Sequence, residues 1–447
     1  MAGGESSFLM RIMQNSTPHT DLPWLVVSDA GGHIFEIPGL EMAGMRLRER
    51  RLPEAAELIP LPFGSALFQL PGRRPVGYDR SRKRFVVLEE HEGQKIFAVG
   101  AFIAPAHTQT LLAAYESTPG AEPLPLFAYS AAGWRDERFF TAGVRVDADI
   151  RQDPAYFNAR LIEQQAALLL KRYPGNRLIG HLVENCVRRY GCPAAQNLAL
   201  GRWEAPIPTS PSCNARCVGC ISKQPEGCVP ETQTRITFVP TPEEIAEYTV
   251  PHLDHAPRPV VSFGQGCEGE PLIQGDLLEQ AIQLIRSRTA SGVINLNTNA
   301  SRPEVIDRLC QAGLDSLRIS LNSARPEPYR AYYRPAGYDW PEVVESMRIA
   351  RRRGRWISLN YFIFPGFTDD PEEMAALISL VKNHHIDYIQ MRNLNIDPEW
   401  YGQALGLEAA APRAIGILAW MEQVKAAAPW IRFGYFNPPR EDWGAGR

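Results

Sequence analysis

The sequence predicts an α/β protein: a partial (β/α)6, TIM-like barrel preceded by a smaller β-rich domain with a helical connector. Three observations predict this fold. Short apolar runs separated by turn residues fill the first 150 positions, helical periodicity follows from about residue 151, and strand-like and helix-like segments alternate from about residue 205. The chain has 447 residues, 45% hydrophobic and 22% charged, so it can bury a sizeable core.

Residues 1–150 are predicted to form the β-rich domain. The expected strand pairs enclose turn signals and are Trp24–Ser28 with His33–Ile37, Arg84–Leu88 with Lys95–Phe102, and Leu124–Ser130 with Arg138–Val146. Strands joined by such short turns indicate an antiparallel sheet. The connector, residues 151–204, is predicted to be helical because Asp153-Pro154 is typical of a helix start and Pro174-Gly175 of a helix end.

Residues 205–400 are predicted to form the partial barrel. The expected strands are Ala205–Thr209, Pro259–Gly264, Val293–Asn299, Ser316–Asn322, Trp356–Phe364 and Tyr388–Leu394. Helix starts with a capping residue followed by proline, such as Thr241-Pro242 and Asp370-Pro371, separate them. Helices between strands imply right-handed crossovers and a parallel sheet. Residues 401–447 are expected to form a helix and a tail that pack on the barrel.

One face of these strands is polar where a parallel sheet is normally apolar. Asn295, Asn297 and Asn299 share one face, and Arg318, Ser320 and Asn322 share one face of the next strand. Because unpaired buried amides are costly, this pattern predicts a barrel interior that holds a ligand or water. The alternative is an antiparallel sheet with one solvated face, which the intervening helices argue against.

Composition and charge exclude other classes of protein. Lys and Arg number 47 against 50 for Asp and Glu, a net charge of −3, which argues against a nucleic-acid partner. No apolar run reaches the ~18 residues that a membrane helix needs, and no signal peptide is visible. We therefore expect a cytoplasmic protein without a membrane partner. Its 8 cysteines are then thiols, metal ligands or catalytic groups before they are disulfides.

Three of those cysteines form a C-x3-C-x2-C run, Cys213, Cys217 and Cys220, directly after the first expected barrel strand. Three thiolates on one loop can bind a soft metal centre. The spacing alone leaves two possibilities open: an iron–sulfur cluster with one free iron, or a zinc site completed by a distant residue such as Cys228.

This run, at the mouth of a βα barrel, resembles the radical S-adenosylmethionine (radical SAM) superfamily. The resemblance covers roughly residues 205–400 and extends to Gly269-Glu270-Pro271 after the second strand, to Thr298-Asn299, to Arg318–Asn322 and to Phe364-Pro365-Gly366. It implies that Cys213, Cys217 and Cys220 bind a [4Fe-4S] cluster whose fourth iron is chelated by S-adenosylmethionine. It also implies an oxygen-sensitive enzyme that cleaves this cofactor to a 5′-deoxyadenosyl radical, which abstracts hydrogen from a substrate.

The resemblance also implies roles for other residues. Gly269 and Glu270 would bind the cofactor's amino group, and Ser320 and Asn322, with Asn299 nearby, would contact the rest of the cofactor. The later strands lie across the barrel, so Asn360, Gln390, Arg392 and Asn393 are the substrate candidates, and Arg392 suits a carboxylate or phosphate. The alternative for Arg392 is an ion pair with Asp397. A reductant such as flavodoxin or ferredoxin is the expected partner, and the substrate is a small molecule or a peptide.

Several residues depart from the pattern or remain ambiguous. Gly219 stands before the third cysteine, where the family often has an aromatic residue, so the packing around the adenine is in question. Cys186, Cys192 and Cys228 are either core thiols or ligands of a second cluster. For Cys267, packing is favoured over a thiol function. The competing functions are a non-enzymatic zinc or iron–sulfur scaffold, and an activase that makes a glycyl radical on a partner protein.

Overall fold

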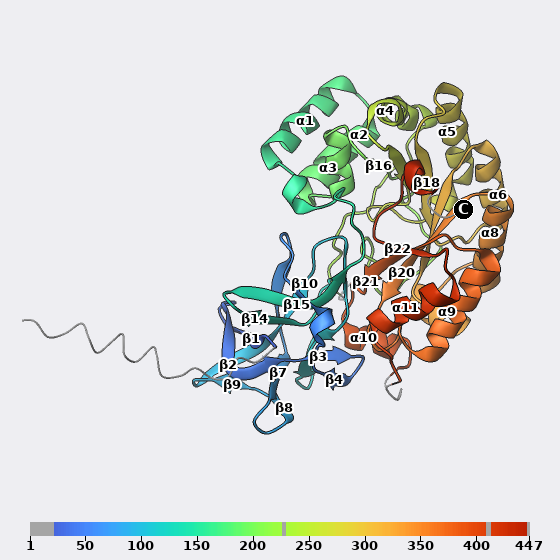
Figure 1. The fold of residues 1–447 in the computed structure, drawn as a ribbon. Coiled ribbons are helices and arrows are strands. Elements are labelled where there is room, and N and C mark those ends of the chain that lie inside the picture. Colours follow the sequence, from blue (N-terminus) through green and yellow to red (C-terminus); the bar gives the residue numbers. More distant parts are fainter. Residues whose placement is uncertain (1–21, 226–228, 408–412, 445–447) are drawn as a thin grey trace, which may run out of the picture.

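The computed structural model describes residues 22–225, 229–407 and 413–444. Figure 1 shows an antiparallel β region beside a larger α/β region, with a group of helices between them in the chain. The α/β class, the partial barrel and the preceding β-rich region are therefore confirmed. No helix in the described ranges is both long and apolar enough to cross a membrane.

The β region consists of a twelve-stranded and a three-stranded antiparallel sheet within the described residues. Its strands are β1 Trp24–Asp29, β2 Ile34–Met42, β3 Gly44–Arg46, β4 Glu49–Arg51, β5 Leu58–Pro60, β6 Ala66–Leu70, β7 Arg73–Asp79, β8 Arg84–Val87, β9 Glu90–His91, β10 Gln94–Phe102, β11 His107–Gln109, β12 Leu112–Ala113, β13 Tyr115–Ser117, β14 Ala132–Arg135 and β15 Arg138–Arg145. The predicted pairing of the first two strands is confirmed. Their turn is held by Asp29 Oδ1, which accepts hydrogen bonds from the backbone N–H of Gly31 (2.8 Å) and His33 (3.0 Å).

The other two predicted hairpins are wrong in their partners. β8 pairs with β7, whereas β10 forms a tight hairpin with β9 around Glu92-Gly93, where both φ angles are positive. The third turn lies at Asp136-Glu137, also at positive φ, and not at Ala131-Ala132-Gly133. Two-residue turns of this type match the twist of the flanking strands, and their exact position depends on which strands pair.

The connector is helical, as predicted. Its elements are η2 Pro154–Tyr156, α1 Ala159–Arg172, α2 Arg177–His181, η3 Leu182–Arg189 and α3 Pro193–Ala199. Asp153-Pro154 begins only the short η2 turn, and Asn158 caps α1 by accepting a hydrogen bond from the N–H of Leu161. The η3 segment is a π-helix, in which hydrogen bonds join residues five apart.

The α/β region is built on one parallel sheet in strand order β16 to β22. Its strands are β16 Glu204–Ile207, β17 Val260–Phe263, β18 Val293–Thr298, β19 Ser316–Leu321, β20 Trp356–Ile363, β21 Tyr388–Asn393 and β22 Arg432–Gly434. Every neighbouring pair is parallel, so the antiparallel alternative is excluded. Six strands match the predicted six. The C-terminal segment adds β22, a seventh strand that the sequence pattern did not predict, because it has only three residues.

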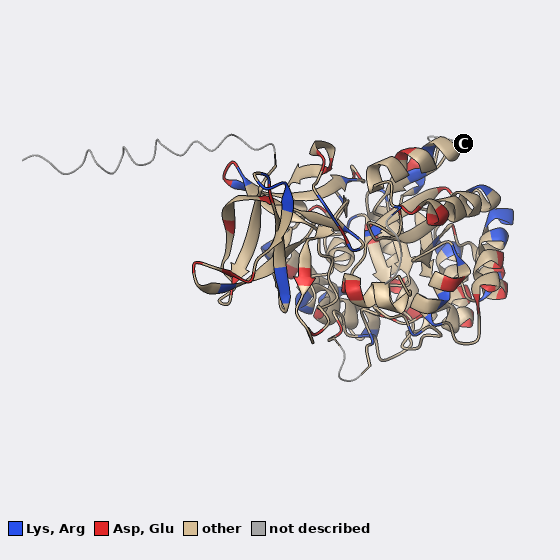
Figure 2. Ribbon diagram, turned by 90° about the horizontal axis from the view of Figure 1, so that it is seen from below, with Lys and Arg blue, Asp and Glu red and all other residues tan. Residues whose placement is uncertain are grey.

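Helices cover the outer face of this sheet (Figure 1). They are α4 Pro242–His255, η4 Pro271–Gln274, α5 Gly275–Arg288, α6 Pro303–Ala312, α7 Pro326–Tyr333, α8 Trp340–Arg352, α9 Pro371–His384, α10 Pro398–Ala404 and α11 Ile417–Ala427, with η5 Arg440–Asp442 near the end. The Thr241 and Asp370 caps hold as predicted. Figure 2 shows Lys and Arg interspersed with Asp and Glu along these helices, which fits the near-neutral net charge.

The β region docks where β20 and β21 end. Thr108 Oγ1 of β11 donates to the carbonyl of Met391 (3.0 Å), and Gln109 Nε2 donates to the carbonyl of Ile363 (3.2 Å). The side chain of Asn393 makes two hydrogen bonds to the backbone of β11: it accepts from the N–H of Gln109 (2.8 Å) and donates to the carbonyl of His107 (3.1 Å). Asn393 therefore joins the two regions, and the β region lies against the carboxyl end of the barrel.

Candidate active site

The loop that carries Cys213, Cys217 and Cys220 follows β16 and lies on the end of α7. Backbone hydrogen bonds fix it there, from Arg216 N–H to the Tyr333 carbonyl (2.9 Å) and from Val218 N–H to the Tyr332 carbonyl (3.0 Å). All three thiols are free, with Cys213 exposed and the other two half-buried. A rigid loop thus presents three thiols at the carboxyl edge of the sheet.

The electrostatics of these thiols suit a cationic centre. Burial, together with the neighbouring Cys220 and Cys213, raises the pKa of Cys217 well above its usual range. Although the Cys213 side chain reaches the surface, desolvation by the surrounding loops and then the charge of Glu270 raise its pKa to about 11. The charged thiolates are costly without a metal, and iron in a cluster would offset that cost by accepting them as ligands. The donor set therefore fits an iron–sulfur cluster.

The sulfurs of the cysteine loop are not arranged as in a tetrahedral zinc site. A tetrahedral zinc ion with Zn–S bonds of ~2.3 Å holds its sulfurs about 3.8 Å apart. Among the described residues, three His, Cys or acidic side chains do come within 4.8 Å of one another at another place in the fold. The thiols of Cys213, Cys217 and Cys220 do not form such a group. The three thiols of this loop are therefore not preformed for a single ion. Cys228 lies outside the described residues.

Arg235 lies beside the third cysteine, and no sequence pattern pointed to it. Its Nη2 donates to Cys220 Sγ (3.5 Å), and both Nε (3.2 Å) and Nη2 (3.1 Å) donate to Ser222 Oγ. A guanidinium next to a ligating sulfur stabilises the thiolate and orients it. Only the tertiary fold brings this cation, fifteen residues along the chain, to the sulfur.

The structure explains why a glycine stands at position 219, where the family often has an aromatic residue. A Cβ at this position would lie 3.2 Å from Tyr332 Oη and 3.3 Å from Ile396 Cβ, closer than most side-chain contacts. Tyr332 is buried, and its ring packs against Phe362 and Tyr401. An aromatic residue from α7 therefore fills the space next to position 219, and a larger residue in the loop would displace it.

The loop after β17, residues 264–271, is held by Glu268, whose role sequence reasoning missed. One carboxylate oxygen of this buried side chain accepts from the N–H groups of Gly264 and Gln265 (both 2.7 Å). The other accepts from the N–H groups of Thr209 (2.7 Å) and Ser210 (2.9 Å). Glu268 thus joins this loop to the start of the cysteine loop.

Gly269 and Glu270 lie directly beside the cysteine loop. A Cβ at Gly269 would lie 2.0 Å from the carbonyl oxygen of Ser212, so only glycine allows this approach. The buried Glu270 carboxylate accepts from the N–H of Leu272 (3.1 Å), the N–H of Asn299 (2.8 Å) and the hydroxyl of Thr298. Burial raises the pKa of Glu270 to about 7. The carboxylate is anchored by protein donors and has acceptor capacity left on Oε2 for an ammonium group.

The other predicted cofactor residues follow the next two strands. Asn299 donates from Nδ2 to Asn214 Oδ1 (2.9 Å), which links the end of β18 to the cysteine loop. Asn322 is buried and donates to the Pro328 carbonyl (3.0 Å) and to Tyr401 Oη (3.1 Å). Its Oδ1 is buried and has no partner among the described residues. Ser320 on β19 is half-buried. An orphaned acceptor at this edge fits a ligand that donates hydrogen bonds.

The polar barrel face forms an interior network, which consists of Glu204, Ser262, Asn295, Asn297, Gln390 and Asn437. Asn437 Nδ2 donates to Glu204 Oε1 (2.7 Å), and Gln390 Nε2 donates to Asn437 Oδ1 (2.8 Å). Asn295 Nδ2 donates to Asn297 Oδ1 (2.8 Å). Asn295 and Asn297 are satisfied within this network, because Glu204 and Asn437 complete it, so these two amides need no ligand or water. Arg318 Nε and Asn322 Oδ1, on the same predicted polar face, have no partner among the described residues.

The predicted substrate residues therefore separate. Gln390 is fully buried in the interior network, and its Oε1 accepts from Arg318 Nη1 (3.0 Å). Arg392 donates from Nε to Asn360 Oδ1 (3.2 Å), and its guanidinium lies 4.3 Å from the Tyr435 ring centroid. The structure brings Asn360 and Arg392 together and assigns Gln390 to internal hydrogen bonding.

Arg318 of β19 and Arg392 of β21 are a cationic pair in the sense that the charge of Arg392 acts on Arg318. Burial and then the charge of Arg392 lower the pKa of Arg318 to about 9. The Arg318 Nε is buried and has no hydrogen-bond partner among the described residues. Neither arginine has a carboxylate within ion-pair distance in the described part of the chain. Two guanidinium groups without an acid partner are suited to a ligand that carries negative charge.

The alternative pairing of Arg392 with Asp397 is wrong. Asp397 forms a buried ion pair with Arg73 of the β region (Nη2–Oδ2 2.7 Å), and it also accepts from the N–H of Leu124 (2.8 Å). A cavity of about 350 Å³ lies close by, between the β region and residues 398–407. It lies apart from the loops that carry the cysteines, so it adds no support to the predicted site.

Comparison with known proteins agrees with this geometry. Residues 207–378 match the family model described as the radical SAM superfamily, so this part of the chain is a radical SAM domain. Members of that superfamily are enzymes that use a [4Fe-4S] cluster and S-adenosylmethionine to generate a 5′-deoxyadenosyl radical. The resemblance inferred from the sequence is confirmed.

Individual relatives match over part of their length. The GTP 3′,8-cyclase of Marinobacter nauticus is 29% identical over 183 residues, 39% of this chain and 49% of the relative. That of Aquifex aeolicus is 30% identical over 190 residues, 41% of this chain and 55% of the relative. The FeMo cofactor biosynthesis protein NifB of Klebsiella pneumoniae is 24% identical over 177 residues, 36% of this chain and 37% of the relative. The chain thus spans about half the length of the two cyclases.

Proposed function

We propose that this chain is a radical SAM enzyme in which Cys213, Cys217 and Cys220 hold a [4Fe-4S] cluster. The observation that carries the proposal is the junction of two loops: three free thiols lie on one, and Gly269-Glu270 lies on the other, with Ser212 in backbone contact. Glu268 clamps the same two loops together. The bound cluster and S-adenosylmethionine would supply the hydrogen-abstracting radical.

The protein's own residues would hold and orient the cofactor. Glu270, ionised above its pKa of about 7, would accept the ammonium of the methionine part. Asn299 and Ser320 lie at the ends of adjacent strands, where they would face the nucleoside, and the orphaned Asn322 Oδ1 is an acceptor at the same edge. Arg235 would keep Cys220 in its ligating thiolate form.

The substrate we propose is an anion bound by Arg318 and Arg392. Burial, and second the charge of Arg392, lower the pKa of Arg318, and a bound phosphate or carboxylate would stabilise both charged guanidinium groups. The relatives named GTP 3′,8-cyclase act on a nucleotide, which carries such groups. Asn360 is a hydrogen-bonding partner of Arg392 and would position it. A small anionic molecule and an acidic peptide both have this chemistry.

The wider organisation follows the sequence analysis. We propose division into residues 1–150, 151–204, 205–400 and 401–447, with the β-rich part lying against the carboxyl end of the barrel. An external reductant such as flavodoxin or ferredoxin would supply the electron, and a cytoplasmic location suits an oxygen-sensitive centre. Limited proteolysis tests the division, because cleavage should concentrate near these junctions.

The test begins with protein purified without oxygen and reconstituted with iron and sulfide. We expect a [4Fe-4S]⁺ EPR signal after dithionite reduction, a change in that signal with S-adenosylmethionine, and release of 5′-deoxyadenosine. Cys217→Ala should abolish the signal and the product, whereas Cys310→Ser, a buried thiol on α6, should retain both. A cluster without any cofactor cleavage would support the scaffold function. Formation of a glycyl radical on an added protein would support the activase.

A further inference from the structure

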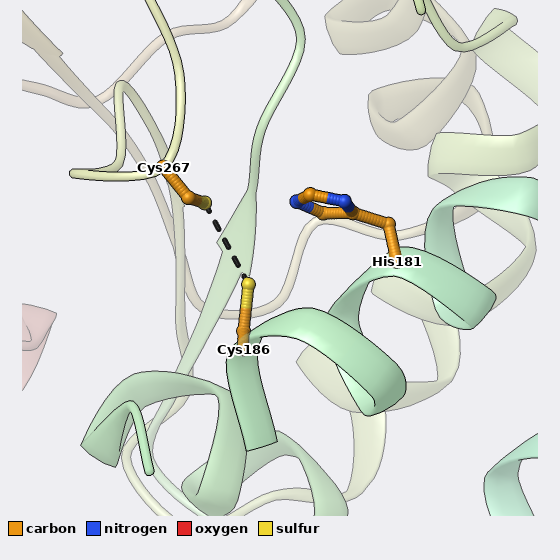
Figure 3. A group of neighbouring side chains, drawn as sticks. All are labelled: His181, Cys186 and Cys267. Atoms are coloured by element: carbon orange, nitrogen blue, oxygen red, sulfur yellow. Dashed lines mark hydrogen bonds between the residues drawn. The ribbon is translucent and has the colours of Figure 1, made fainter. Parts of the chain in front are cut away.

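A second group of metal-ligating side chains lies outside the proposed active site. It consists of His181, Cys186 and Cys267, whose ligand atoms all lie within 4.8 Å of one another. The two sulfurs are 3.6 Å apart. Figure 3 shows the imidazole of His181 directed toward both sulfurs, with Cys267 reaching in from the loop after β17.

The π-helix explains why His181 and Cys186 meet. They are five residues apart, and in an α-helix, at 3.6 residues per turn, that spacing places side chains about 140° apart. In η3, which begins directly after His181, hydrogen bonds join residues five apart, so such side chains stack on one face. The π conformation is uncommon and concentrates at functional sites. It is the local feature that aligns these two ligands.

The third ligand comes from a different part of the chain. Cys267 lies in the loop of residues 264–271, and its carbonyl accepts a hydrogen bond from the N–H of Ile236 (2.7 Å). Cys186 and Cys267 are both buried. His181 Nε2 is buried too and has no hydrogen-bond partner among the described residues. A buried ring nitrogen without a partner is rare in a stable protein, and its orientation toward two thiols is that of a metal-ligand set.

We propose that His181, Cys186 and Cys267 bind one soft divalent transition-metal ion, zinc being the best match. One imidazole nitrogen and two thiolates form a Cys₂His ligand set, which in zinc proteins leaves a fourth position open. The sulfur–sulfur distance of 3.6 Å is close to the ~3.8 Å that tetrahedral zinc requires. Binding converts two thiols to thiolates and releases two protons.

The metal would tie the connector to the loop that carries Gly269 and Glu270. Cys267 is two residues before Gly269 and adjacent to Glu268, which clamps the cysteine loop. Cys186 and Cys267 already share one hydrophobic core cluster with Val183, Val187 and Ile236, and the ion would add a direct link between η3 and this loop. The site is separate from the proposed cluster site and does not depend on the proposed function, since its ligands are other residues.

The test uses the full chain with Cys213, Cys217 and Cys220 all changed to alanine, so that no cluster forms. After reduction with a phosphine, the protein is titrated with Co²⁺ without oxygen. We expect one equivalent to bind, with sulfur-to-cobalt charge-transfer absorption and the intense d–d bands of a tetrahedral ion. Zinc should displace the cobalt, and elemental analysis should then find about one zinc per chain.

Further variants in that background assign the ligands. Cys186→Ser and Cys267→Ser should each remove most of the charge-transfer absorption, and His181→Asn should shift the d–d bands and weaken binding by roughly tenfold or more. Cys310→Ser, the matched buried thiol, should leave the spectrum unchanged. If a ligand variant does not fold, the cobalt spectrum of the parent still reports sulfur ligation.

Two results would overturn the proposal. The first is a fully reduced parent that binds no cobalt or zinc, including the case in which the isolated protein holds only a disulfide between Cys186 and Cys267. The second is a cobalt spectrum that is unchanged by both serine variants, since the sulfurs would then come from elsewhere.

Discussion

The interior network and the carboxyl-end loops of the barrel are both polar, yet they differ in how their hydrogen-bonding and charge requirements are met. In the network, Asn437 and Gln390 bind each other, and Glu204 accepts from Asn437. At the carboxyl end, three thiols are free, and Asn322 Oδ1 is buried without a partner in the described ranges. A polar barrel face therefore does not by itself indicate a ligand site. Charged or hydrogen-bonding groups that have no partner in the protein do indicate one.

Removal of a satisfied ion partner should have the largest effect. Asp397→Ala would leave the buried Arg73 guanidinium without its carboxylate, and we expect a loss of about 3–5 kcal/mol in the free energy of unfolding. Urea denaturation measures it. The double variant Arg73→Met with Asp397→Leu should recover only part of the loss, because it removes both charges from the interior but also removes the Asp397 cap of α10. A single variant as stable as the parent would contradict the buried ion pair.

A change in the interior network should have a smaller effect. Asn437→Ala would leave the Gln390 amide and the Glu204 carboxylate with an unmet hydrogen bond each, at a cost of about 1–3 kcal/mol. The same denaturation measurement applies. Asn383→Ala on the exposed face of α9 is the matched control, expected within about 0.5 kcal/mol of the parent.

A change in the cationic pair should leave stability unaltered and reduce anion binding. Arg392→Gln keeps a hydrogen bond to Asn360 within reach and relieves repulsion with Arg318. We expect unfolding within about 0.5 kcal/mol of the parent, and a roughly tenfold to hundredfold loss of pyrophosphate affinity by calorimetry. Arg348→Gln, on the exposed face of α8, should change neither quantity. Equal pyrophosphate affinity in parent and Arg392→Gln would remove the arginine pair from the proposed substrate site.

The smallest expected effect is a pH dependence at Glu270. Its pKa of about 7 means that the carboxylate is mostly protonated at pH 6 and mostly ionised at pH 8. An ammonium binds the ionised form, so S-adenosylmethionine affinity should rise about tenfold over that range. Glu270→Gln should flatten the profile. The stability of the unliganded protein should change in the opposite direction. The pKa of Glu270 in the folded protein lies above the unfolded value of 4.5, so the contribution of Glu270 to the free energy of unfolding falls as the pH rises from 4.5 to 7.

The sequence predicted the positions of strands and helices better than it predicted which strands and side chains pair with one another. The six barrel strands lie within one or two residues of the predicted positions, since alternation along a strand and proline-preceded caps are local signals. The hairpin partners in the β region were wrong, because turn residues mark a reversal without selecting the strand opposite. The cysteine run and Gly269-Glu270 were recognisable because they are contiguous motifs.

By itself, the sequence determined the order of strands and helices, the superfamily of residues 207–378 and the identity of the candidate ligands. The tertiary structure decided which polar groups are already satisfied. Asn437 meets Glu204 across 233 residues, Asp397 meets Arg73 across 324, and Cys186 meets Cys267 across 81. No local pattern encodes such pairs, because hydrogen bonds and ion pairs act over a few ångströms in space, and packing of the whole chain sets which side chains come that close.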